Sequence, residues 1–191
     1  MPDTVAKWKT KRGTKIFLVG TGHGKTEPGA DVVATIRAVE PDVVVVPLCE
    51  ETKHLLEREN YGDFHAAARE IKIPRHGKKA ELVLGDRSAV ATLGRAAVFF
   101  LGELWNSSGK KAWARVWMRT IIRERNVWFA LSLAEIEADR DNQERPGVVV
   151  GVVDVSRLPG VVEEWVKMEE SNVSATKKDL ERIGPFAFKA I

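Results

Sequence analysis

Cysteine is scarce in this chain, because Cys49 is the single cysteine among 191 residues. One cysteine cannot form a disulfide within the chain, which excludes the disulfide frameworks of small secreted proteins and indicates a reducing compartment. Long apolar runs are missing as well, and no stretch reaches the roughly 18 residues that a membrane-spanning helix needs. We therefore expect an intracellular protein without a transmembrane segment.

A strong excess of either charge is also absent. Lys and Arg number 30 and Asp and Glu 27, which gives a formal net charge of +3 at pH 7, and the isoelectric point is near 9.0. This balance is too mildly basic to indicate nucleic-acid binding by itself. With 44% hydrophobic and 30% charged residues, the chain has the composition of a globular protein, and its length favours one domain with a sizeable core.

The first 14 residues form a basic arm with one acidic residue, Asp3. They lack the apolar segment of a secretory signal. We expect a solvated tail or a partner-binding extension here, with a degenerate mitochondrial presequence as the alternative. The domain is predicted to span residues 15–168. Residues 169–191 are expected to form a C-terminal extension with a short helix that starts at Ser174 and stops at Gly184.

Four runs rich in Val and Leu predict β-strands, at residues 15–19, 42–48, 81–86 and 147–153. Because these runs lack polar alternation, they are typical of strands covered on both faces, as in a parallel sheet. Helical spacing of apolar residues follows three of them, at residues 30–40, 88–105 and 158–168. This alternation predicts an α/β fold with a mostly parallel sheet and flanking helices.

A further long helix is expected within residues 110–143, where Trp113, Trp117 and Trp128 fall close to one helical face. Its first half is basic and its second half is acidic. One interpretation is a helix that packs on the core and carries solvated charges. The alternative is an interface with a partner protein, because Trp and Arg are enriched at interface hot spots. The three tryptophans are therefore candidate interface residues.

The stretch "FLVGTGHGKT", residues 17–26, ends a predicted strand with a Gly-rich turn. It resembles a phosphate-binding P-loop, but that motif requires glycine at the position of Val19. Glu27 and Pro28 follow where a helix should begin and an anion should bind. A nucleotide site is therefore not expected, and no organic cofactor is assigned.

Three further histidines are His54, His65 and His76. A spacing of eleven places the first two on one helical face, but Gly62 and Pro74 interrupt the helix that a shared site needs. We interpret all three as surface or core histidines rather than metal ligands.

Five segments between Lys15 and Trp165 share a recognisable pattern: "FLVGTGHGK", "DVVATIRAVEPDVVVVPLCEE", "LVLGDRSAVATLGRA", "IIRERNVWFALSL" and "VVVGVVDVSRLPGVVEEW". Together and in this order they resemble the TraB/Tiki/pheromone-shutdown family, especially its eukaryotic TraB-domain-containing proteins. The resemblance implies a TraB-like α/β fold of the erythromycin-esterase/ChaN-like type. It also implies a site at the carboxyl ends of the strands, where open parallel sheets usually bind ligands. The regions after Cys49 and after Ala97 are shorter than is usual for the family.

In Tiki-type members, two Gly-x-x-His motifs are associated with metal-dependent peptide hydrolysis. The first motif is present here and ends at His23. A neutral imidazole at the end of a strand can bind a divalent metal ion, which lowers the pKa of a bound water so that the water can attack a substrate. The resemblance thus implies His23 as a metal ligand.

Three positions depart from the family pattern. Arg157 replaces the second histidine, Pro47 stands where an acidic residue is usual, and Asn126 replaces an aspartate. Arginine stays protonated and has no lone pair for a metal, so the substitutions indicate that the metal chemistry is lost. The family positions that remain are His23, Asp86, Arg87, Glu124 and Arg125.

In the structural interpretation of these residues, Asp86 caps the following helix and Arg87 pairs with Glu124. This leads to our first hypothesis, a catalytically degenerate TraB-like domain, or pseudoenzyme, that serves as a structural or accessory subunit. Its partners would be other protein subunits of a larger assembly. The resemblance to eukaryotic relatives implies a mitochondrial location.

Two alternatives stay open. The chain is a metal-dependent hydrolase of the TraB/Tiki type if His23 works with Asp86, Glu124 or Asp154. It is an anion- or nucleic-acid-binding domain, with RNA as one ligand, if Arg157, Lys25 and the basic stripe of residues 110–125 bind phosphate groups.

Overall fold

A computed structural model of the chain describes residues 4–22, 29–58, 62–74, 77, 79–86, 110–141 and 147–170. Its elements, in chain order, are β1 (Val5–Lys9), β2 (Lys15–Thr21), α1 (Ala30–Val39), β3 (Val43–Val46), η1 (Lys53–Glu57), α2 (Gly62–Glu70), β4 (Glu81–Leu84), α4 (Lys110–Asp141), β5 (Val148–Asp154) and α5 (Leu158–Glu170). Side chains of α4 are described for residues 122–139. No helix within these ranges is long and apolar enough to cross a bilayer.

The described strands form a sheet in the order β1-β2-β5-β3-β4. The pairs β2–β5, β5–β3 and β3–β4 are parallel, and β1 runs antiparallel to β2. Each of the four predicted strand runs overlaps a strand of this sheet, and all four residues of β3 are buried. The predicted α/β fold with a mostly parallel sheet is confirmed.

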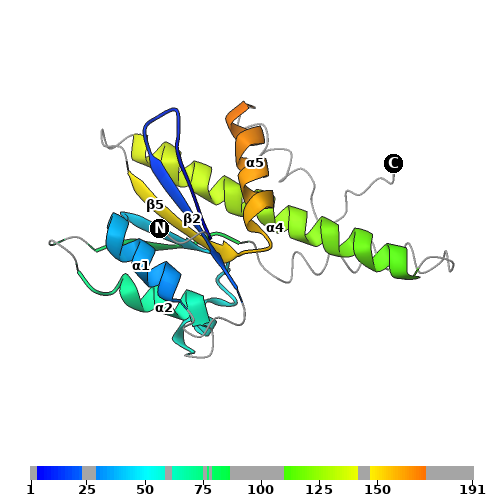
Figure 1. Cartoon of the computed structure of the whole chain (residues 1–191), viewed down its shortest axis with the longest axis horizontal. Coiled ribbons are helices and arrows are strands. Elements are labelled where there is room, and N and C mark those ends of the chain that lie inside the picture. The colour runs from blue at the N-terminus through cyan, green and yellow to red at the C-terminus, as the bar shows by residue number, and fades with distance from the viewer. Residues whose placement is uncertain are drawn as a thin grey trace.

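Helices cover both faces of the sheet, with α1 and α2 on one face and α4 and α5 on the other (Figure 1). Neighbouring residues of a strand point to opposite faces, so Val44 and Val45 of β3 enter different hydrophobic clusters. The cluster on the side of α4 and α5 includes Ile16, Leu18, Phe129 and Trp165. The cluster on the side of α1 and α2 includes Val19, Val32, Ile36 and Val150.

Phe129 of α4 is completely buried. It fits against the sheet because two neighbouring positions, in β5 and just after β4, are glycines without a side chain. A Cβ atom on Gly151 of β5 would lie 3.1 Å from Phe129 Cε1, and one on Gly85 would lie 3.0 Å from Phe129 Cδ2. Both distances are shorter than ordinary contacts, so the glycines make room for the ring. The interruption of the valine run by Gly151 is thus explained by the packing of α4.

The N-terminal arm is the fold prediction that the structure corrects. Residues Val5–Lys9 of the expected tail form β1 and pair with β2 along their whole length. Trp8 packs against Trp165 of α5, with ring centroids 5.8 Å apart. The signal for this strand was the alternation of Ala6 and Trp8 with Lys7 and Lys9, which is the period of a half-exposed strand.

The predicted helices are found where the structure describes their residues. α1 ends one residue before Glu40, α4 fills the predicted range 110–143 nearly to its end, and α5 continues past Met168 to Glu170. The predicted helix at 88–105 and the short helix after Ser174 lie outside the described residues.

Candidate functional site

The carboxyl ends of β2, β5, β3 and β4 meet at one edge of the sheet because these strands run parallel. Thr21 of β2 lies beside Asp154 of β5, and Val46 of β3 lies beside Leu84 of β4. The residues that follow each strand therefore gather at this edge, where the site was expected. Residues 124–126 of α4 reach the same edge through the contacts described next.

Asp86 is the carboxylate at the centre of this edge. Its backbone N–H donates to the carbonyl oxygen of Leu48 at 3.1 Å, so the pairing of β3 with β4 fixes its position. Its side chain is 4% exposed, and Arg125 Nε donates to Oδ2 at 2.6 Å. Charge-assisted hydrogen bonds of this kind are shorter and stronger than neutral ones. Asp86 is thus neutralised by Arg125.

Arg157, which follows β5 and precedes α5, is the second cation at this edge. Its side chain is 9% exposed, and its Nη1 lies 4.0 Å from Asp86 Oδ2. Its Nε donates to Oδ1 of Asn126 at 3.0 Å. The pKa of Arg157 is lowered to about 10, first by burial and then by the positive charge of Arg125, against the opposing effect of Asp86 and Asp154. The guanidinium therefore stays charged at neutral pH.

Asn126 is held against the first turn of α5. A Cβ atom on Gly160 would lie 2.3 Å from Asn126 Nδ2, a distance that no real side chain tolerates. Gly160 therefore lets α4 and α5 approach closely enough for Asn126 to reach Arg157. From the sequence, Asn126 was interpreted only as the loss of a carboxylate. The available signal for its contact with Arg157 was Gly160 in the first turn of α5.

Asp154, at the end of β5, is committed to a local turn. Its Oδ1 accepts hydrogen bonds from the backbone N–H of Ser156 at 2.8 Å and from Ser156 Oγ. The carboxylate thus shapes the connection between β5 and α5. Pro47 contributes its carbonyl oxygen to the same edge, 3.4 Å from Nη2 of Arg125.

These residues do not fit a divalent metal ion. Arg125 covers the carboxylate of Asp86, and the nearby Arg157 guanidinium offers donors but no lone pair. Within the described ranges, no group of three or more His, Cys, Asp or Glu side chains is arranged to hold a metal. Catalytic zinc requires about three such protein ligands.

Two predicted site residues, His23 and Arg87, lie outside the described residues, as does Lys25. The pairing of Arg87 with Glu124 and the capping of the next helix by Asp86 therefore stay predictions. What the structure brings together is Asp86 with Arg125, and Arg157 with Asn126.

The other predicted histidines make local contacts to the backbone. His54 Nδ1 lies 2.9 Å from the carbonyl oxygen of Glu51, and His65 Nδ1 lies 2.7 Å from that of Leu56. His76 falls outside the described part of the chain. Each described imidazole therefore has its own backbone partner.

The candidate interface residues of α4 are described in part. Trp128 is partly buried and packs against the core cluster beneath α4 and α5. Trp113 and Trp117 belong to the first turns of α4, whose side chains are not described. From the basic stripe, Arg123 Nε lies 3.5 Å from Oε1 of Glu164 on α5. This pair joins the two helices.

Comparison with known proteins supports the resemblance seen in the sequence. No protein-family model matches the chain. It is similar to the TraB domain-containing proteins of Bos taurus and Mus musculus, each at 25% identity over 252 residues, which covers 86% of this chain and 66% of the relative. The human TraB domain-containing protein is 42% identical over 57 residues, or 30% of this chain and 15% of the relative. The resemblance to TraB domain-containing proteins is confirmed.

The chain spans 66% of the length of the bovine and mouse relatives. The alignment runs over 252 residues, whereas this chain has 191, so the relatives carry segments that this chain lacks.

Proposed function

From this similarity to TraB domain-containing proteins, we propose that the chain is a catalytically degenerate TraB-like domain, a structural or accessory subunit of a larger protein assembly. One observation carries the proposal. The carboxylate of Asp86 is bound by Arg125 at 2.6 Å, beside a second guanidinium from Arg157. Protein cations thus already neutralise Asp86, one of the carboxylates that a metal site with His23 would use.

The electrostatics of the strand ends support the loss of metal chemistry. A divalent ion at Asp86 has to displace Arg125 and then lie close to Arg157, whose charge repels it in a poorly solvated environment. Asn126 gives Arg157 a neutral acceptor and supplies no anion. The substitutions at positions 126 and 157 therefore act together against cation binding.

The proposed role as a subunit, and its location in mitochondria, are supported by the resemblance to eukaryotic TraB-domain-containing proteins. Fractionation of cells that express a tagged full-length chain tests the location. Recovery of the chain in the mitochondrial fraction is expected, and recovery in the cytosol alone would contradict this part of the proposal.

The subunit role is tested by mild purification of the tagged full-length chain from its native source. Size-exclusion chromatography with mass spectrometry identifies co-eluting proteins, and elemental analysis measures metal in the same fraction. We expect a large complex with stoichiometric protein partners and far less than one transition metal per chain. A lone monomer would contradict the subunit role. One metal per chain, with peptidase activity that His23→Ala abolishes, would contradict the degenerate site.

A restored variant provides the comparison for metal binding. Arg157→His with Asn126→Asp returns an imidazole and a carboxylate to the two family positions. Thermal unfolding is measured with and without added Mn²⁺ or Zn²⁺. The metal is expected to raise the unfolding temperature of this variant more than that of the wild-type chain. Equal stabilisation of the wild-type chain and of the restored variant would contradict the proposal. Arg157→Met is the control, because it removes the positive charge without supplying a metal ligand.

A further inference from the structure

β1 is an open edge of the sheet, because among the described strands it pairs with β2 alone. Two backbone hydrogen bonds define which residues face β2. Gly20 N–H donates to the carbonyl oxygen of Thr4 at 2.8 Å, and Thr10 N–H donates to that of Thr14 at 2.9 Å. In antiparallel pairing the backbone groups alternate between the partner strand and the outside. The even-numbered residues of β1 therefore bond to β2.

The odd-numbered residues Val5, Lys7 and Lys9 consequently point their N–H and C=O groups away from the sheet. Within the ranges that the structure describes, no hydrogen bond reaches these outward groups. Exposed edges of this kind are templates for the addition of another strand. The exposed edge is short, since β1 has 5 residues.

The side chains of these residues make the edge basic. Lys7 and Lys9 are exposed, and Lys9 lies directly opposite Lys15 of β2 on the same face. Lys9 and Lys15 form a non-hydrogen-bonded pair, in which side chains are closest and like charges destabilise the sheet. In the part of the chain that the structure describes, none of the three lysines forms an ion pair.

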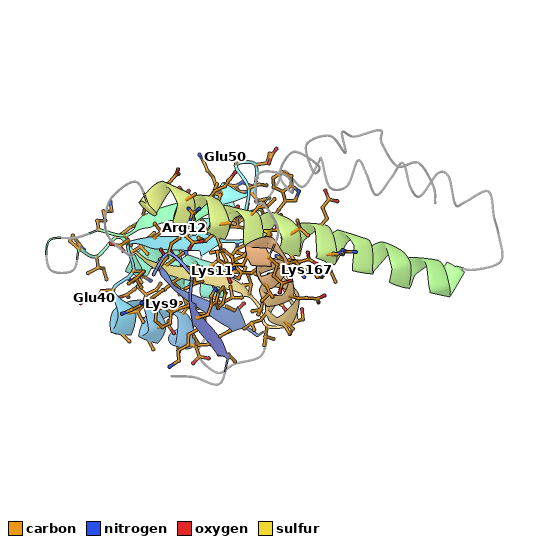
Figure 2. The ribbon with its side chains drawn as sticks, turned by 90° about the horizontal axis from the view of Figure 1, so that it is seen from above. Lys9, Lys11, Arg12, Glu40, Glu50 and Lys167 are labelled. Atoms are coloured by element: carbon orange, nitrogen blue, oxygen red, sulfur yellow. The ribbon has the colours of Figure 1, made fainter. Side chains whose placement is uncertain are left out.

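The whole β1–β2 hairpin shares this charge. Residues 4–21 contain no acidic side chain, and their basic residues are Lys7, Lys9, Lys11, Arg12 and Lys15. Figure 2 labels three of these residues, which extend from the hairpin. Lys11 is already engaged, since its Nζ donates to the carbonyl oxygen of Glu169 at 3.1 Å. The lysines of the strands themselves remain available to a ligand.

We propose that β1 binds an extended acidic segment of a partner protein, which joins the sheet as an additional strand. The backbone of the segment bonds to the outward groups of Val5, Lys7 and Lys9. Its alternate residues carry carboxylates opposite Lys7 and Lys9, where opposite charges across strands are stabilising. This inference rests on the proposed function, because it assigns a surface and a chemistry to the partner of the subunit.

The charge pattern selects against other occupants of this edge. A second copy of β1 would place lysines against lysines, which is a common protection against self-association. A membrane surface favours apolar side chains beside the basic ones, but the exposed large hydrophobic residues of the described ranges are Ile73, Ile122, Val155 and Val166, none of them on the hairpin. A nucleic acid would use the lysines but not the free backbone edge.

The test uses the full-length chain and a synthetic fluorescent peptide of roughly ten residues, about twice a typical strand length, in which Glu alternates with Thr. Binding is measured by fluorescence anisotropy. Lys7→Glu with Lys9→Glu is expected to weaken binding at least about tenfold, because attraction becomes repulsion at two cross-strand positions. The matched control is Lys72→Glu with Lys79→Glu, which changes the net charge equally at two exposed lysines elsewhere and should leave binding within about twofold.

Amide hydrogen exchange distinguishes strand addition from simple charge attraction. The outward amides of Lys7 and Lys9 should exchange at least about tenfold more slowly when the peptide binds, whereas Ala6 and Trp8 are already bonded to β2 and should change little. Several results would overturn the inference: no peptide binding, equal binding of an N-methylated peptide, or tighter binding of an RNA oligomer of equal charge.

The two proposals fail in different ways. If the chain co-purifies with partners but the peptide does not bind, the assignment of β1 falls and the subunit role stands. If the peptide binds but the native chain is a lone metalloenzyme, the subunit role falls and the binding edge stands.

Discussion

Arg157 Nε donates a hydrogen bond of 3.0 Å to Asn126 Oδ1. The sequence predicts both positions as departures from the TraB/Tiki pattern, and in the structure the two residues are partners of each other. The guanidinium is nearly buried, so it depends on the acceptors around it. Arg157 and Asn126 therefore act as one unit at the strand ends.

Asn126→Ala should lower the free energy of unfolding by about 1.5–3 kcal/mol, because a buried charged donor loses its acceptor. Within the described residues, Nη2 of Arg157 has no hydrogen-bond partner either, so the guanidinium has little to compensate the loss. Urea denaturation measures the effect. Asn126→Asp is the control, since it keeps an acceptor oxygen and should be at least as stable as Asn126→Ala. If Asn126→Ala unfolds at the same urea concentration as the wild type, the hydrogen bond between Arg157 and Asn126 does not stabilise the fold.

Gly160→Ala is expected to destabilise the chain by about 1–3 kcal/mol, because the new methyl group overlaps the Asn126 amide. The cost should shrink or change sign in the Asn126→Ala background, where the overlap is removed and alanine favours the helix. A double-mutant cycle by urea denaturation provides the comparison. Additive effects would show that the two residues do not compete for the same space.

Gly151→Ala should destabilise the core by about 1–3 kcal/mol through overpacking. Its Cβ atom would lie 2.9 Å from Leu18 Cδ1 and 3.1 Å from Phe129 Cε1, in a part of the core without solvent access. Thermal unfolding of Gly22→Ala serves as the control, because the nearest atom to that Cβ is 4.0 Å away in Val155. If both variants unfold at the same temperature, the packing explanation for Gly151 is wrong.

The charge of Arg157 predicts a defined pH dependence. Its pKa is lowered to about 10, with burial as the largest cause. At lower pH the group is charged in both the folded and unfolded states, so the stability difference between wild type and Arg157→Met should stay constant from about pH 7 to about pH 9. Above about pH 10 the unfolded chain retains the proton longer. The contribution of Arg157 to stability should therefore rise with pH in that range.

Urea denaturation of wild type and Arg157→Met at about pH 7, 9 and 10.5 measures the difference in their unfolding free energies. Proton linkage predicts that this difference is constant up to about pH 9 and larger at about pH 10.5. A difference in unfolding free energy that falls as the pH rises above 10 would contradict the burial of the charged guanidinium.

Local sequence was sufficient for most of the sheet and its helices. The unbroken valines of β3 and the helical spacing in α1 and α5 depend on neighbours in sequence, so the pattern alone located these elements. β1 was missed because its lysines suggested a solvated tail, although its alternate residues Ala6 and Trp8 face the core. Only pairing with β2 distinguishes an edge strand from such a tail.

The sequence by itself determined the α/β class and the similarity to TraB domain-containing proteins, because motifs and periodicity are local properties. The tertiary structure decided which residues meet. Arg125 reaches Asp86 across 39 positions, and Arg157 reaches Asn126 across 31. Such contacts depend on how α4 and α5 cross the strand ends, and that crossing depends on Gly151 and Gly160, whose missing side chains set the distance between the layers.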